Sequence, residues 1–69
     1  MIFHLKKDTR IYVAGHKGLI GSAFVRFFKK NHFTNIITRD RRELELTSES
    51  ETNNFFREMQ PEVVVLAAG

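Results

Sequence analysis

Three of the four glycines of this chain stand in one short segment, Gly15-His16-Lys17-Gly18-Leu19-Ile20-Gly21. A continuous apolar and β-rich run, Thr9–Ala14, precedes this glycine loop, and apolar residues at helical spacing follow it. A buried strand that ends in a glycine turn and passes directly into a helix is typical of α/β folds with a parallel sheet. The loop therefore constrains the fold class more than any other feature of the 69 residues.

The helix after the loop is predicted to be amphipathic. Its apolar face is expected to comprise Leu19, Ile20, Ala23, Phe24, Phe27 and Phe28. Lysines in its last turn suit the negative end of the helix dipole. A second strand is predicted at Asn35–Arg39 and a very short third one at Glu43–Leu46.

A second helix is predicted to begin after Thr47 or Ser48, because Ser48 and Glu51 have the spacing of a capping box. Pro61 ends it, and Glu62–Ala67 is predicted to be a strand buried on both faces. The core-facing stripe of this helix is expected to be Thr52, Phe55, Phe56 and Met59. The order βαββαβ predicts a parallel sheet with right-handed crossovers. Because the last predicted strand has the sequence of an interior strand and the chain stops as soon as that strand ends, we expect the sequence to be cut short.

The glycine spacing predicts a cradle for a pyrophosphate. The first glycine permits the tight turn, the second lets the backbone approach the ligand, and the third lets helix and strand pack closely. The amides at the helix start then favour the negative charge. The loop is one residue longer than G-x-G-x-x-G, and no lysine follows Gly21, which disfavours a nucleoside-triphosphate P-loop. The alternative is an ordinary glycine-rich turn. The residues expected to contact a dinucleotide are Gly15, His16, Lys17, Gly18, Leu19, Ile20 and Gly21.

The end of the second predicted strand is rich in arginine, with the sequence Thr38-Arg39-Asp40-Arg41-Arg42. NAD-binding domains place an acidic residue there to hold the ribose 2′-hydroxyl, whereas a guanidinium suits a 2′-phosphate. We therefore expect NADP, held by Arg39 and by Arg41 or Arg42. Asp40 is the residue that could serve NAD instead.

Composition excludes several other classes. The chain has no cysteine, its three histidines lack ligand-like spacing, and its longest apolar run is too short to span a bilayer. We therefore expect no metal site, no membrane span and a cytoplasmic location. The net charge of +3 alone would allow a nucleic-acid binder. That reading is disfavoured because most phenylalanines lie on the predicted helix stripes and not among exposed arginines.

The run Val13–Ala23 resembles the N-terminus of the GDP-L-fucose synthases, which are epimerase/reductases of the extended short-chain dehydrogenase/reductase family. Their pattern G-H-[RK]-G-[ML]-[VI]-G-S-A is matched at every position. Arg39–Leu46 is similar to the family's R-x-R-x-E-L-[DN]-L stretch, and Pro61–Ala68 resembles the strand that ends in paired alanines. The similarity extends from about Arg10 to the end of the sequence. It implies the N-terminal part of a Rossmann-type NAD(P)-binding domain over residues 1–69, without a separate substrate domain.

The resemblance also implies residue roles. Lys17 takes the position of a basic residue near the cofactor phosphate, and Arg39 reaches the 2′-phosphate of NADP(H). His16 is expected to order the turn. Asp40 departs from the family, whose members often carry a small hydroxyl residue there. The segment from Leu44 through Leu46 to Thr47 would lie near the adenine, and Ala67 and Ala68 would line the ribose and nicotinamide side.

The family's catalytic Ser and Tyr-x-x-x-Lys are not in this sequence, whose one tyrosine, Tyr12, is followed four residues later by His16. No catalytic residue is therefore assigned, and the chain alone is expected to be inactive. A GDP-sugar partner is expected only for a full-length enzyme, and a homo-oligomer is expected. The alternatives are a non-catalytic nucleotide-binding or oligomerising module and another NAD-dependent epimerase/dehydratase.

Overall fold

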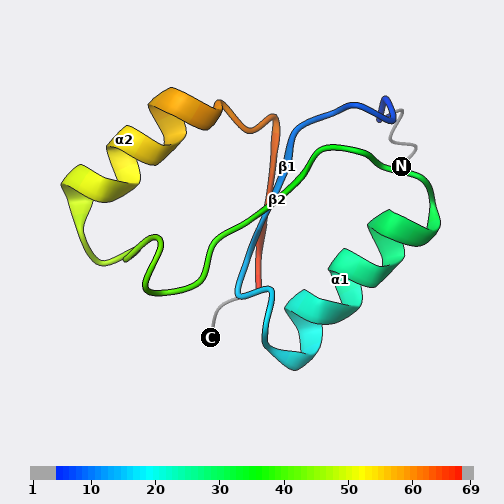
Figure 1. Cartoon of the computed structure of the whole chain (residues 1–69), viewed down its shortest axis with the longest axis horizontal. Helices are drawn as coiled ribbons and strands as arrows, with labels where there is room; N and C mark the ends of the chain where they lie inside the picture. Colours follow the sequence, from blue (N-terminus) through cyan, green and yellow to red (C-terminus); the bar gives the residue numbers. More distant parts are fainter. Residues whose placement is uncertain (1–4, 68–69) are drawn as a thin grey trace.

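The computed structural model describes residues 5–67, which form a three-stranded parallel sheet with one helix on each side (Figure 1). The strand order is β2-β1-β3, so β1 is central. This arrangement confirms the predicted α/β class with a parallel sheet. The elements in chain order are β1 (Ile11–Ala14), α1 (Leu19–Lys30), β2 (Ile36–Thr38), α2 (Glu49–Met59) and β3 (Val63–Leu66).

The sheet is covered on both faces by apolar side chains that alternate along β1. Every residue of β1 is buried, and Ile11 pairs with Ile36 of β2 and with Val63 of β3. Alternate side chains of a strand point to opposite faces. On the α1 face the buried cluster is Ile11, Val13 and Phe28. On the α2 face it is Tyr12, Ala14, Ile37, Leu44 and Phe55.

The first helix begins inside the glycine loop as predicted, but the prediction of its buried face was wrong. The helix packs against the sheet through Gly21, Val25 and Phe28, which follow the spacing i, i+4, i+7. Close contact between Gly21 and Gly15 fixes this rotation. Five of the six expected apolar positions are therefore exposed: Leu19, Ile20, Ala23, Phe24 and Phe27.

The short strand predicted at Glu43–Leu46 is not formed, and this prediction was also wrong. The amides of Glu43 and Leu44 both donate to the carbonyl of Asp40, at 3.1 and 2.9 Å, as in one turn of helix. Those amides are consequently unavailable for sheet pairing. The turn places Leu44 in the core on the α2 face.

The second helix has the predicted ends. The hydroxyl oxygen of Ser48 accepts a hydrogen bond from the amide of Glu51 at 3.4 Å. At the other end Gln60 adopts a left-handed conformation with φ of 46°, directly before Pro61. Between these ends Phe55 is buried, and Met59 packs partly against the same cluster.

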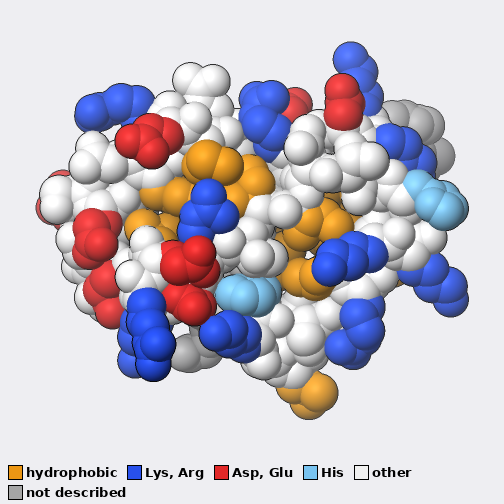
Figure 2. All heavy atoms as spheres, in the orientation of Figure 1, with side chains coloured by type: hydrophobic (Ala, Val, Ile, Leu, Met, Phe, Trp, Pro, Cys, Tyr) orange, Lys and Arg blue, Asp and Glu red, His pale blue; other side chains and the backbone are white. Residues whose placement is uncertain are grey.

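The last strand is an edge strand among the described residues, and the prediction that both its faces are buried was wrong. It pairs with β1 on one side, and its side chains alternate between half-buried and exposed. Leu66 is 78% exposed because neither helix covers the end of β3. In Figure 2 apolar side chains are visible between the sheet and each helix. No helix in residues 5–67 has the length and apolarity needed to cross a membrane.

Candidate cofactor-binding site

A hollow of about 370 Å³ opens where the chain leaves β1 and β2. Ligands of open α/β sheets bind at this end, outside the carboxyl ends of the parallel strands. Two segments form its walls: the glycine loop after β1 and residues 39–47 after β2. Its lining residues are Tyr12, Gly15, His16, Lys17, Gly18, Arg39, Asp40, Arg41, Leu44, Glu45, Leu46 and Thr47.

The glycine loop is a tight turn that brings the start of α1 onto the end of β1. Gly15 has a positive φ of 81°, a conformation that glycine adopts without steric cost. The amide of Gly18 donates to the carbonyl of Gly15 at 3.0 Å and closes the turn. A Cβ on Gly21 would lie 1.9 Å from the same carbonyl oxygen, so only glycine fits there.

The first turn of α1 begins directly after Gly18, which lines the hollow. The amide of Ser22 makes the first helical hydrogen bond, to the carbonyl of Gly18 at 2.9 Å. Gly18 is the N-cap and has no side chain to accept from the amides that follow it in the first turn, and this turn carries no acidic residue. Amides in this position, with the positive end of the helix dipole, favour an anion such as a pyrophosphate.

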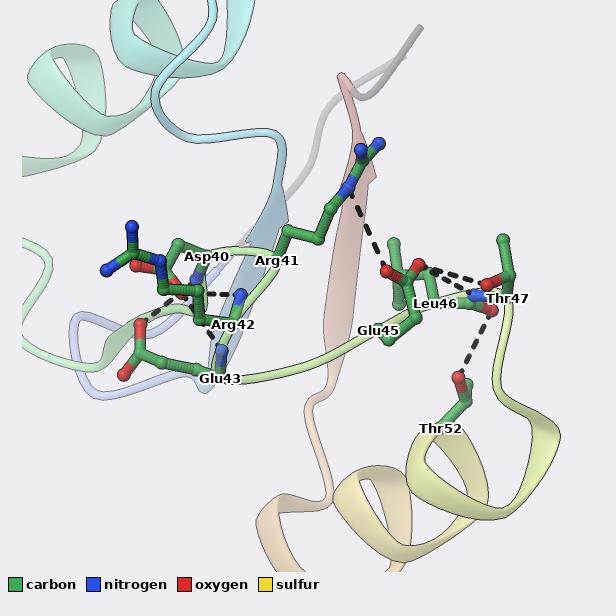
Figure 3. Close-up of polar contacts among 8 residues, drawn as sticks. All are labelled: Asp40, Arg41, Arg42, Glu43, Glu45, Leu46, Thr47 and Thr52. Carbon is green, nitrogen blue, oxygen red and sulfur yellow. Dashed lines mark hydrogen bonds and ion pairs between the residues drawn. The ribbon is translucent and has the colours of Figure 1, made fainter.

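The segment after β2 is held by a reciprocal pair of hydrogen bonds between Asp40 and Glu43 (Figure 3). Oδ1 of Asp40 accepts from the amides of Arg42 and Glu43, both at 2.9 Å. Oε1 of Glu43 accepts from the amide of Asp40 at 3.0 Å. This is the geometry of a capping box. The hydrogen bond from the Glu43 amide, with the Lys17 ammonium nearby, lowers the pKa of Asp40 below its ordinary value although burial opposes this.

One ion pair connects the two walls of the hollow. Nζ of Lys17, in the glycine loop, lies 3.3 Å from Oδ2 of Asp40. The Lys17 side chain is 72% exposed and that of Asp40 27%. Both oxygens of the Asp40 carboxylate therefore have partners within the protein.

The two arginines that line the hollow differ in their surroundings. Arg39 is half-buried: its guanidinium lies 5.6 Å from the centre of the Phe55 ring, and Nη1 donates to the carbonyl of Thr38 at 2.7 Å. Arg41 is exposed, with Nε 3.9 Å from a carboxylate oxygen of Glu45. Beneath them, burial raises the pKa of Tyr12 and the charge of Arg39 opposes this shift.

The structure brings many of the sequence-predicted residues together. Leu19, Ile20, Gly21 and Ala67 do not line this hollow, and Ala68 lies outside the described residues. Instead, Leu19 and Ile20 border a separate apolar hollow along α1. The predicted residues that line the hollow are Gly15, His16, Lys17, Gly18, Arg39, Arg41, Leu44 and Leu46.

Sequence reasoning did not place Tyr12 in the site and did not find the fixed position of Asp40. Tyr12 is fully within β1, and nothing in the pattern distinguishes it from other core residues of that strand. For Asp40 a signal was present. Asp40 and Glu43 have the same capping-box spacing as Ser48 and Glu51.

A glycine loop that joins a central parallel strand to a helix, beside an arginine-lined hollow, defines a Rossmann-type nucleotide-binding domain. The chain belongs to the NAD dependent epimerase/dehydratase family, which it matches over residues 11–69.

Similar proteins are named as synthases or reductases of GDP-sugars. GDP-L-fucose synthase 1 of Arabidopsis thaliana is 44% identical over 62 residues, which are 90% of this chain and 19% of that protein. A GDP-D-glycero-L-gluco-heptose synthase of Campylobacter jejuni, solved with NADPH, has a TM-score of 0.91 and 40% identity over 94% of this chain and 19% of that one. A C. jejuni GDP-mannoheptose C4 reductase with NADP bound has a TM-score of 0.91 and 38% identity, covering 94% and 21%. The chain thus spans about a fifth of these relatives.

Proposed function

We propose that this chain is the N-terminal, NADP-binding part of a GDP-4-keto-6-deoxymannose 3,5-epimerase/4-reductase, a GDP-L-fucose synthase. The observation that carries the NADP preference is the state of Asp40, whose carboxylate is held by its own turn and by Lys17. It is therefore not free to accept from both ribose hydroxyls. Arginine side chains line the same hollow, and their guanidinium groups suit a phosphate. The named relatives support the substrate class.

The residues of the hollow fit a dinucleotide phosphate. The amides at the start of α1, behind Gly15 and Gly18, would hold the pyrophosphate. Lys17, Arg39 and Arg41 would meet the 2′-phosphate, with the adenine near Leu44 and Leu46. We propose Ala67 and Ala68 for the ribose and nicotinamide side, and Leu19, Ile20 and Gly21 through their backbone. When bound, the cofactor supplies the hydride for the reduction.

The remaining steps belong to the whole protein. We propose that the epimerisation and the binding of the GDP-sugar need residues other than those of this chain, since it has no Tyr-x-x-x-Lys. The chain alone is therefore expected to be inactive. Within residues 5–67 no strand pairs with the outer side of β3, where Leu66 is exposed, and this supports the proposal of a homo-oligomer. A cytoplasmic location stays an expectation from the sequence.

A chimera tests the proposed function. This chain would replace the matching 62-residue segment of the Arabidopsis synthase. We expect NADPH oxidation with GDP-4-keto-6-deoxymannose within about tenfold of the parent kcat/KM, since a tenfold change corresponds to only about 1.4 kcal/mol of transition-state stabilisation. NADH should be a poorer reductant for the chimera. A folded chimera that binds NADPH but gives no turnover with this substrate would contradict the proposal.

Arg39 is expected to determine affinity for the 2′-phosphate. Arg39→Met keeps an apolar stem over Phe55 and removes the charge. Hydrogen bonds to a charged group contribute about 1.5–3 kcal/mol, so the affinity for adenosine 2′,5′-bisphosphate should fall about ten- to a hundredfold. Binding of 5′-AMP, which lacks the 2′-phosphate, should change by less than about threefold. Calorimetric titration of both nucleotides measures this.

The matched control is Arg57→Met, which removes the same charge from the exposed last turn of α2. It should leave both affinities nearly unchanged. Equal losses for the two nucleotides in Arg39→Met would show that Arg39 supports the fold of the hollow and does not select the phosphate.

A further inference from the structure

The Lys17–Asp40 ion pair lies where the proposed 2′-phosphate would enter. Both residues line the hollow, and they come from opposite walls, 23 residues apart in the sequence. Within the described residues no other ion pair connects the glycine loop with the segment after β2. The ammonium of Lys17 therefore already has an anionic partner.

The two partners differ in freedom to move. Asp40 is fixed, because Oδ1 accepts from two backbone amides and the Asp40 amide donates to Glu43. Lys17 has a long stem and is largely exposed. Ordering such a side chain costs conformational entropy, and an exposed ion pair gains little in return. Lys17 is thus the partner that a stronger anion can draw away.

We propose that Asp40 is a specificity-determining positioning residue that holds the Lys17 ammonium at the hollow and competes with the 2′-phosphate for it. The inference rests on the proposed NADP-binding function. The Lys17 ammonium must give up its ion pair with Asp40 to meet the phosphate, and Asp40 cannot follow it because its turn fixes the carboxylate. The carboxylate therefore weakens NADP binding in proportion to the charge at the 2′ position, and leaves ligands without that charge almost unaffected.

The experiment compares the chain with Asp40→Asn, which removes the charge but keeps an oxygen for the amides of Arg42 and Glu43. The probes are adenosine 2′,5′-bisphosphate and 5′-AMP, titrated by calorimetry. We expect Asp40→Asn to bind the bisphosphate about fivefold more tightly, a gain typical of one partly exposed charge, and 5′-AMP within about twofold. The gain should shrink as ionic strength rises from about 0.05 M to about 0.3 M.

Two further variants separate the proposed role from simpler ones. Glu62→Gln removes one negative charge at the opposite end of the sheet, where Glu62 pairs with Arg10, and should leave the preference for the bisphosphate unchanged. In a Lys17→Met background the gain from Asp40→Asn should fall to less than about twofold, because the contested ammonium is gone. A gain of full size in that background would show direct repulsion alone and would overturn the positioning role.

A folding control accompanies each titration. Asp40→Ala removes both the charge and the capping oxygen, so it should lower the thermal midpoint more than Asp40→Asn does. If the chain prefers the bisphosphate but Asp40→Asn does not raise that preference, the inference fails and the proposed function stands. If no variant prefers the bisphosphate over 5′-AMP, both the NADP-binding function and the inference fail.

Discussion

Gly21→Ala is expected to destabilise the fold by about 3 kcal/mol, because the added methyl group has no space. Its Cβ would lie 1.9 Å from the carbonyl oxygen of Gly15 and 3.0 Å from the Cα of His16. Both neighbours are backbone atoms, so no side chain can rotate away. Relief requires α1 to move from the end of β1, which also separates Phe28 from the core on that face. A domain of this size has a total stability of only about 3–10 kcal/mol.

Chemical denaturation followed by circular dichroism measures this loss as a lower midpoint. Gly18→Ala is the matched control, since a Cβ there would meet the Gly15 oxygen at 3.4 Å, an ordinary contact. Gly18 also has a negative φ, which alanine adopts. We expect Gly18→Ala to cost less than about 1 kcal/mol. Equal midpoints for Gly21→Ala and the unchanged chain would contradict the packing role of Gly21.

The parts of the fold that the sequence predicted correctly have local causes. The turn at Gly15 and the cap at Ser48 depend on neighbours a few residues away, so their residue types indicate the structure directly. The rotation of α1 about its own axis cannot be deduced from residue types in this way. Apolar residues lie around much of this helix, and contact of Gly21 with Gly15 selects the buried side. A hydrophobic pattern alone could not distinguish Phe27 from Phe28.

The strand wrongly predicted at Glu43–Leu46 and the wrong burial predicted for β3 have different physical reasons. Glu43–Leu46 alternates charged and apolar residues as a strand does. However, the hydrogen bond from the Glu43 amide to the Asp40 carboxylate holds the start of this segment in a turn. In β3 the apolar sequence suits an interior position, whereas burial depends on what pairs with its outer side. Composition cannot supply that information. The exposure of Leu66 therefore reflects what surrounds β3 within residues 5–67, and the apolar sequence of the strand does not predict it.

The sequence was sufficient to predict which charged and polar groups lie at the candidate site. The arginines after β2 and the amides after β1 follow from sequence position, because parallel strands bring their carboxyl ends to one edge. The partners of Asp40 did not follow from it. Whether this carboxylate faces a ribose or its own turn depends on three hydrogen bonds that only the folded loop shows.

Phe55→Ala is expected to cost about 3–4 kcal/mol and to weaken the cofactor site together with the fold. The Phe55 ring lies 4.6 Å from that of Tyr12, centre to centre, and is the buried residue through which α2 reaches the sheet. The guanidinium of Arg39 lies 5.6 Å from the centre of the same ring. Truncation leaves a cavity beside Leu44 and removes the support of that arginine.

Phe56→Ala is the control, because Phe56 is next to Phe55 in the sequence but is 36% exposed. The centre of its ring lies 6.1 Å from the centre of the Tyr12 ring. It should cost about 1 kcal/mol, since less apolar area leaves the core. Thermal unfolding measures the stability of each variant. Titration with adenosine 2′,5′-bisphosphate, at a temperature below the unfolding midpoint of each variant, measures the affinity. Loss of affinity in Phe55→Ala at temperatures where the chain stays folded would show that the core residue positions Arg39. Unchanged affinity would mean that the guanidinium holds its place through its hydrogen bonds to the Thr38 carbonyl and the Met59 sulfur.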